Sequence, residues 1–126
     1  MLKLEDEQIE HISPQTPPNG ESIASGYDLN DESKYNEDFV SDYLNCLGNL
    51  MLISGTHNRS IGNIPFEHKL RSYNSNPLLN QQAEIKTFAS KDGDRFIWDM
   101  KAIDERHNSI FDFSMSNWSY NSIIEE

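Results

Sequence analysis

The sequence predicts an α+β domain, because two short strand patterns stand among longer segments with helical spacing. The first strand pattern is Gln8 to Ile12, a short run stopped by Pro14. The second is NLMLI at 49–53, a short apolar run that follows Gly48 and suits a buried strand. The other periodic segments repeat at helical spacing, so helices should form the larger part of the fold.

Helices are predicted from capping residues and from the spacing of apolar side chains. Asn36 can cap a first helix, which Gly48 ends, and Pro65 suits the first position of a later one. A further helix runs to about Phe88 and ends at a Ser-Lys-Asp-Gly stretch. We therefore expect helices at 36–47, 66–73 and 78–88.

The C-terminal region, 94–118, carries the clearest helical pattern. Asp94 is its candidate cap, and Trp118 should lie beyond the helix. His107 falls on the apolar stripe and is expected to be a packed core residue. The residues that share one face are Phe96, Ile97, Met100, Ile103, His107, Ile110 and Phe111.

The length of 126 residues allows one domain, 1–126, with one modest core. Residues 16–35 are rich in Pro, Gly, Ser, Asn and acidic residues, which predicts a long, mobile surface loop. The chain has no apolar run long enough to cross a membrane and begins too acidic for a signal peptide, so we expect it in the cytoplasm. Cys46 is the single cysteine, which excludes an internal disulfide and a thiolate-rich zinc site.

The net charge of −11 argues against a free-standing nucleic-acid binder, because Lys and Arg supply most of the affinity for phosphates. A nuclease with this charge would need another domain or subunit to bind DNA. The charge also favours an alternative from a different class, a non-catalytic acidic protein that binds a basic partner or mimics DNA.

Three segments carry a recognisable motif: IEHISPQ at 9–15, LGNLMLI at 47–53, and HNRSIGNIPFEHK at 57–69. In that order they resemble the ββα-metal finger of HNH nucleases, most closely the HNH-related C-terminal domain of GmrSD-type DNA restriction enzymes. That family's pattern runs approximately His-Ile-x-Pro, then Leu-Gly-Asn-Leu-x-Leu, then Asn before Pro-Phe-x-x-Lys. The resemblance extends weakly to Trp98, Ile103, Arg106 and Trp118, which look like the family's closing helix.

The resemblance implies a two-stranded hairpin and a helix that form the site, packed against a mainly helical remainder. It also implies a DNA endonuclease of a restriction or phage-defence system. His11 would be the general base, a role that suits imidazole because its ordinary pKa of about 6.5 is close to working pH. Glu10 and Asn58 would be ligands of a divalent ion, Mg²⁺ or Mn²⁺, with His57 a possible competitor.

Further roles follow from the same resemblance. Asn49 would fix the loop and orient the base, although a residue after Gly48 can also be an ordinary turn or cap residue. Asn58 has the same alternative as a helix cap. The candidate phosphate-binding residues are Arg59, Lys69 and Arg71, of which the last two suit a solvated helix face equally well.

The expected partners are DNA and a second protein unit. Members of the family usually carry an upstream ParB-like, nucleotide-handling domain, and here the His motif follows within a few residues of Met1. We therefore expect the partner unit in a part of the protein outside this sequence or in a separate chain. A truncated remnant that folds without activity is the remaining alternative.

Overall fold

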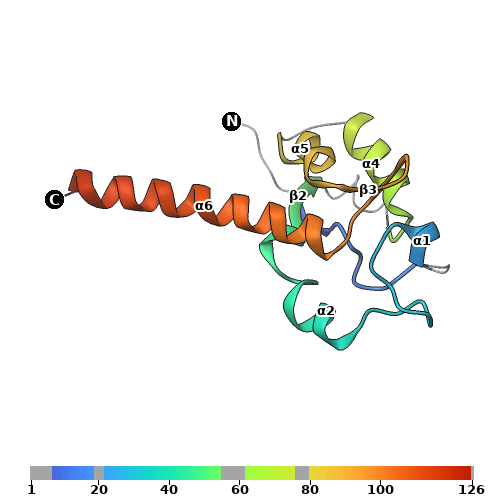
Figure 1. The fold of residues 1–126 in the computed structure, drawn as a ribbon. Helices are drawn as coiled ribbons and strands as arrows, with labels where there is room; N and C mark the ends of the chain where they lie inside the picture. The colour runs from blue at the N-terminus through green and yellow to red at the C-terminus, as the bar shows by residue number, and fades with distance from the viewer. Residues whose placement is uncertain (1–6, 19–21, 55–61, 76–79, 126) are drawn as a thin grey trace.

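The computed structural model describes residues 7–18, 22–54, 62–75 and 80–125 (Figure 1). The α+β prediction is confirmed: helices surround two small antiparallel strand pairs. The elements in chain order are β1 (Glu7–His11), α1 (Ser22–Ser25), α2 (Glu37–Asp42), the 3-10 helix η1 (Leu47–Asn49), β2 (Leu50–Ser54), α4 (Phe66–Ser75), α5 (Asn80–Phe88), β3 (Ser90–Asp92), β4 (Arg95–Ile97) and α6 (Met100–Glu125).

Strands β1 and β2 form the predicted pair, although about 40 residues separate them along the chain. Their antiparallel register sets Glu7 opposite Ser54 and His11 opposite Leu50. Glu10 lies opposite Met51, and both side chains are buried. Because successive residues of a strand face opposite sides, Glu10 and His11 leave β1 in opposite directions.

The second strand pair was not predicted and changes the start of the last helix. Strands β3 and β4 pair Asp92 with Arg95 across a turn in which Gly93 has a φ of +64°. Phe96 and Ile97 therefore belong to a strand, and the predicted helix from Asp94 is wrong over these residues. The apolar spacing was compatible with both structures, but the two-residue turn at Gly93 and Asp94 returns the chain on itself.

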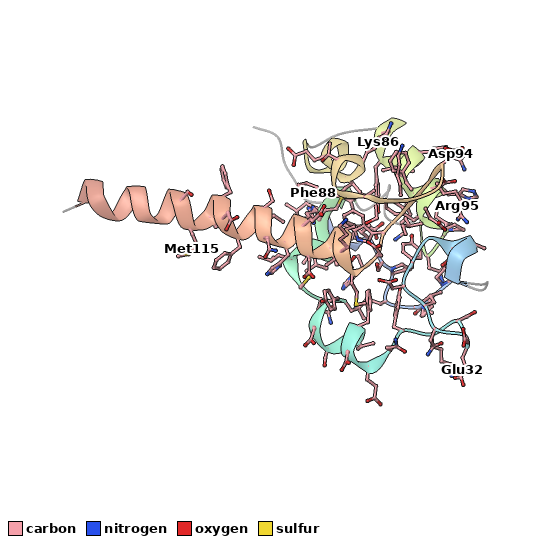
Figure 2. All side chains as sticks on the ribbon, viewed as in Figure 1. Glu32, Lys86, Phe88, Asp94, Arg95 and Met115 are labelled. Atoms are coloured by element: carbon pink, nitrogen blue, oxygen red, sulfur yellow. The ribbon has the colours of Figure 1, made fainter. Side chains whose placement is uncertain are left out.

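Helix α6 begins at Met100, and Asp99 caps it. The Asp99 carboxylate accepts hydrogen bonds from the Ala102 amide at 3.0 Å and the Ser90 hydroxyl at 2.7 Å. The helix runs to Glu125, so Trp118 lies inside it and not beyond it. Figures 1 and 2 show its second half extending away from the rest of the molecule, with Met115 on that part. Among the described residues, no helix has both the length and the apolar character to cross a membrane.

Two further expectations need correction. The segment 16–35 is not a surface loop throughout: it forms α1, and it places Tyr27 and Leu29 in the core. Tyr27 also forms an isolated parallel bridge with Trp98, which ties this segment to the start of the C-terminal region. The helix expected at 36–47 ends at Asp42, and η1 follows as a separate turn.

The core lies between the first strand pair, α4, α5 and the first turns of α6. Its largest members are aromatic, and the Phe66 and Trp98 rings stack with centroids 5.4 Å apart. The buried apolar residues are Ile12, Tyr27, Leu29, Phe39, Leu44, Met51, Ile53, Phe66, Leu70, Tyr73, Ile85, Trp98, Ala102 and Ile103. His107, expected among them, is half-buried on α6.

Candidate active site

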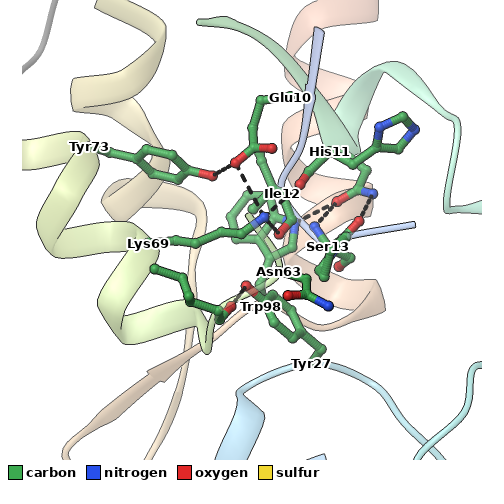
Figure 3. A network of polar contacts seen from close by, with 12 residues as sticks. Glu10, His11, Ile12, Ser13, Tyr27, Asn63, Lys69, Tyr73 and Trp98 are labelled. Carbon is green, nitrogen blue, oxygen red and sulfur yellow. Dashed lines mark hydrogen bonds and ion pairs between the residues drawn. The ribbon is translucent and has the colours of Figure 1, made fainter. Parts of the chain in front are cut away.

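His11 ends β1 and stands half-buried at the edge of the core (Figure 3). Its ring atom Nε2 lies 2.8 Å from Oδ1 of Asn45, an exposed residue between α2 and η1. An amide oxygen can only accept a hydrogen bond, so Nε2 is the donor in this contact. In the neutral ring with its proton on Nε2, Nδ1 is the nitrogen that can take up a proton. Asn45 was not singled out from the sequence, where no local pattern connects it with His11.

Glu10 turns away from His11 into the protein interior. Its side chain is 5% exposed, and Oε2 lies 3.2 Å from Nζ of Lys69. The same oxygen accepts a hydrogen bond from the Tyr73 hydroxyl at 2.8 Å. Figure 3 shows the three side chains converging from β1 and α4. Burial raises the pKa of Tyr73 well above its ordinary value, with the Glu10 charge as the next cause, so this phenol remains a proton donor.

Lys69 is fully buried, although it was expected on a solvated helix face or in contact with phosphate. Its ammonium group donates to the main-chain oxygens of His11 at 2.8 Å and Ile12 at 3.1 Å. Burial lowers the pKa of Lys69, and the neighbouring carboxylate of Glu10 opposes that shift. The structure therefore leaves Lys69 unavailable for phosphate, because its ammonium is enclosed by these partners.

Asn49 is buried where η1 meets β2 and bonds to segments far apart in the sequence. Its Oδ1 accepts from the Ser13 amide at 2.8 Å and from Nε1 of Trp98 at 3.0 Å. Its Nδ2 donates to the carbonyl oxygens of Ser13 at 3.1 Å and Leu44 at 2.9 Å. In addition, the Ile12 amide donates a hydrogen bond to the main-chain carbonyl oxygen of Asn49 at 2.9 Å. These contacts fix the residues that follow His11.

Arg106 supports the other strand of the pair from α6. Its Nη1 lies 3.1, 3.0 and 2.7 Å from the carbonyl oxygens of Leu47, Gly48 and Leu50. These oxygens belong to η1 and the start of β2, whose turn would otherwise leave carbonyls unpaired near the core. The resemblance assigned Arg106 to a closing helix without giving it a task, and the sequence alone does not show which carbonyls it meets.

The remaining predicted site residues divide into one that is described and several that are not. Arg71 is exposed on α4, so it can meet a phosphate, and that role stays a prediction. His57, Asn58 and Arg59 lie outside the described residues, and their proposed roles also stay predictions.

Of the two ligands expected for a divalent ion, Glu10 is described and Asn58 lies outside the described residues. Glu10 was the expected acidic ligand, but its carboxylate is buried against a lysine ammonium, whose positive charge opposes a second cation at the same oxygens. Within the described ranges, no group of three or more His, Cys, Asp or Glu side chains is arranged to hold a metal ion. Glu10 as placed here therefore does not fit a metal ligand.

Comparison with known proteins assigns the chain to a family. A family model described as "GmrSD restriction endonucleases, C-terminal domain" matches residues 2–113, which is most of the sequence. No curated protein and no solved structure matches the chain. The matched range includes both strands of the first pair, α4 and the first half of α6, so it contains every residue of the site described above. The chain belongs to the family of C-terminal domains of GmrSD restriction endonucleases.

Proposed function

We propose that the chain is an HNH-type endonuclease module that hydrolyses DNA phosphodiester bonds within a restriction or phage-defence system. The family supplies the nuclease class. The observation that supports a specific catalytic residue is the contact between His11 Nε2 and Asn45 Oδ1, because it leaves the basic nitrogen of a half-buried imidazole for substrate.

In this proposal His11 acts as the general base. Nδ1 takes a proton from a water molecule, whose oxygen then forms a bond to phosphorus. The bond from phosphorus to the leaving oxygen breaks, and that oxygen must receive a proton. Asn45 keeps the ring in the required tautomer, while Asn49 fixes Ile12 and Ser13 beyond it. Neither amide takes part in proton transfer.

The proposed cofactor is Mg²⁺ or Mn²⁺. Such ions at phosphoryl-transfer sites often keep several waters and bind substrate phosphate oxygens, so they need few protein ligands. Asn58 is the candidate ligand that remains from the sequence. Removal of divalent ions with a chelator should stop cleavage, and replacement with Mg²⁺ or Mn²⁺ should restore it.

DNA affinity is proposed to come mainly from a partner. The net charge of −11 opposes binding to a polyanion, and the two described basic residues nearest the site, Lys69 and Arg106, are buried and bonded to the protein itself. Arg71 and Arg59 are the candidates for phosphate contact within this chain. A ParB-like, nucleotide-handling domain or subunit would supply the rest.

The direct test is cleavage of supercoiled plasmid, modified and unmodified, by wild type, His11→Ala and His68→Ala. His68 is a matched control because it is an exposed histidine on α4. Loss of the base should reduce the cleavage rate by a factor of about 10² or more, whereas the control should cleave like wild type. Equal cleavage by His11→Ala and wild type would refute the assignment of the base.

The alternative, an acidic protein that occupies a basic partner, is favoured by the charge alone. A DNA mimic would compete with DNA for a basic protein and would do so equally well after His11→Ala. If His11→Ala still competes with DNA for the basic protein, and wild type shows no metal-dependent cleavage, the acidic binding protein is the correct function.

A further inference from the structure

The ion pair beneath His11 points to a function for Glu10 other than metal binding, because it belongs to a set of contacts that engages all three protons of the Lys69 ammonium. A lysine ammonium has three N–H donors and no acceptor. In this structure Nζ has three oxygen partners, namely Glu10 Oε2, the His11 carbonyl and the Ile12 carbonyl, at 3.2, 2.8 and 3.1 Å. The partners therefore account for every donor. No donor is left for a DNA phosphate.

The charges of the pair also require each other. The side chains of Lys69 and Glu10 are 0% and 5% exposed, and either charge alone would be strongly unfavourable at that depth. The Tyr73 hydroxyl gives the carboxylate a further hydrogen bond and shares Oε2 with Lys69. A divalent ion at this carboxylate would have to displace the ammonium or remain beside it, and in both cases a buried positive charge loses its partner.

The position of the carbonyls connects the pair with the candidate base. The His11 carbonyl belongs to the residue that carries the imidazole, and the Ile12 carbonyl belongs to the next peptide unit. On the far side of the strand, the imidazole meets Asn45, and beyond it Asn49 holds Ser13. The end of β1 is thus fixed from α4 at its main chain and from the loop before η1 at its ring.

We propose that Glu10 and Lys69 are positioning residues whose buried ion pair holds the His11 and Ile12 carbonyls and so directs the imidazole, and that Glu10 is not a ligand of the catalytic ion. The catalytic value of this arrangement rests on the proposed function, but the pairing and the orientation of His11 do not. Tyr73 completes the arrangement by keeping Oε2 directed towards α4.

The first experiment measures the pairing by thermal unfolding in chelator, with wild type, Glu10→Gln, Lys69→Met and the double variant. Each single variant leaves a buried group without its partner and should lower Tm by about 10 °C or more. The double variant removes both charges, so its Tm should be higher than that of Lys69→Met. Additive losses, or a Tm that rises in Glu10→Gln, would overturn the pairing.

The second experiment follows the ¹⁵N signals of the His11 ring by NMR in the same variants. Lys69→Met and the double variant should both move these signals, because each removes the donor to the His11 carbonyl, even where the double variant regains stability. Ile85→Ala is the control, since it removes a buried core side chain on α5 and destabilises the fold without touching the pair. Unchanged His11 signals in the double variant would overturn the positioning role.

The third experiment titrates Mn²⁺ in the cleavage reaction with wild type and Glu10→Gln. A positioning residue should lower the maximal rate while the half-saturating Mn²⁺ concentration stays within about threefold of wild type. A metal ligand should raise that concentration by tenfold or more, which would overturn the proposal. If wild type cleaves no DNA without the proposed partner, unfolding and NMR still decide whether Glu10 and Lys69 position His11.

Discussion

The two strand pairs of this protein have the same antiparallel architecture but are held in different ways. At β1–β2, three buried side chains bond to main-chain carbonyls of the strands or of the residues that adjoin them: Lys69 from α4, Asn49 from η1 and Arg106 from α6. In β3–β4, the strands have three residues each, all of them half-buried or exposed. The ammonium groups of Lys86 and Lys91 lie over the Phe96 ring, at 5.4 and 4.9 Å from its centroid.

Most of the buried polar groups among the described residues therefore lie at the first strand pair. A short strand pair needs support to be stable, and side-chain packing can supply it without any buried charge. The first pair instead packs against buried polar groups: the Glu10 carboxylate, the Lys69 ammonium, the Arg106 guanidinium and the Asn49 carboxamide. Burial of each of these groups is unfavourable unless it is fully hydrogen-bonded. Two of these groups, Lys69 and Asn49, bond to the main chain at His11 and just after it, so buried polar groups and the candidate base lie at the same end of β1.

The largest expected effect is that of Gly48→Ala beside the first pair. A Cβ at this position would overlap the Ile103 carbonyl oxygen and lie 2.8 Å from the His107 Cβ, so α6 would have to move away from η1. That movement would also pull Arg106 from the carbonyls that it holds. We expect a loss of about 3 kcal/mol or more in the free energy of unfolding, measured by guanidinium denaturation. A loss below about 1 kcal/mol would mean that this packing is loose.

Asn49→Asp should have the next largest effect, because it keeps the size of the side chain and changes only its bonding. The carboxylate cannot donate to the Ser13 and Leu44 carbonyls, which would then face a negative charge. We expect a loss of about 2–3 kcal/mol at pH 7 in the free energy of unfolding. Asn108→Asp, at an exposed position of α6, is the matched control and should change stability little.

The Asn49→Asp loss should also depend on pH in a definite direction. Burial against two carbonyls raises the folded-state pKa of the introduced acid above its unfolded value, so the folded state binds more protons between these two values. The deficit relative to wild type should therefore shrink as the pH falls from 7 to 4, because the protonated acid regains one donor. A deficit that grows over this range would contradict the bonding described for Asn49.

Asn45→Ala should affect cleavage more than stability. The residue is exposed, so its loss should change the free energy of unfolding by no more than about 0.5 kcal/mol. Without Oδ1 the His11 ring can take either tautomer or rotate, and we expect cleavage to fall by about tenfold. The check is the single-turnover cleavage rate beside that of Asn108→Ala. Equal rates would show that Asn45 does not orient the base.

The sequence predicted the first strand pair and α4 well, because short apolar runs, glycine and proline act locally. It did not predict β3–β4, since Phe96 and Ile97 also fit the helical spacing of the residues after Met100. For short segments, periodicity alone does not separate strand from helix. Here the turn at Gly93 and Asp94 makes the segment a strand.

The candidate site was predicted by resemblance far more than by local pattern. Resemblance named His11 and Asn49, but it could not show that Lys69 is enclosed or that Asn45 and Tyr73 complete the surroundings. The contacts that decide these points join residues 34, 58 and 63 positions apart. Whether a lysine on a helix meets solvent or a buried carboxylate is a property of the packed structure, and its own sequence neighbours carry no signal of it.

Gly93→Ala should have the smallest effect, although the residue has a positive φ. The φ of +64° imposes a backbone cost of about 1 kcal/mol on alanine, but an added Cβ would meet no atom within 4 Å. The β3–β4 turn is exposed and contributes no bond to the His11 surroundings, so the Tm should fall by a few degrees and cleavage should stay at the wild-type rate. Alanine at Gly93 thus causes backbone strain alone, whereas alanine at Gly48 disrupts the packing of η1 against α6. A loss of cleavage in a folded Gly93→Ala variant would show that the second strand pair also contacts DNA. Function would then not be confined to the first strand pair.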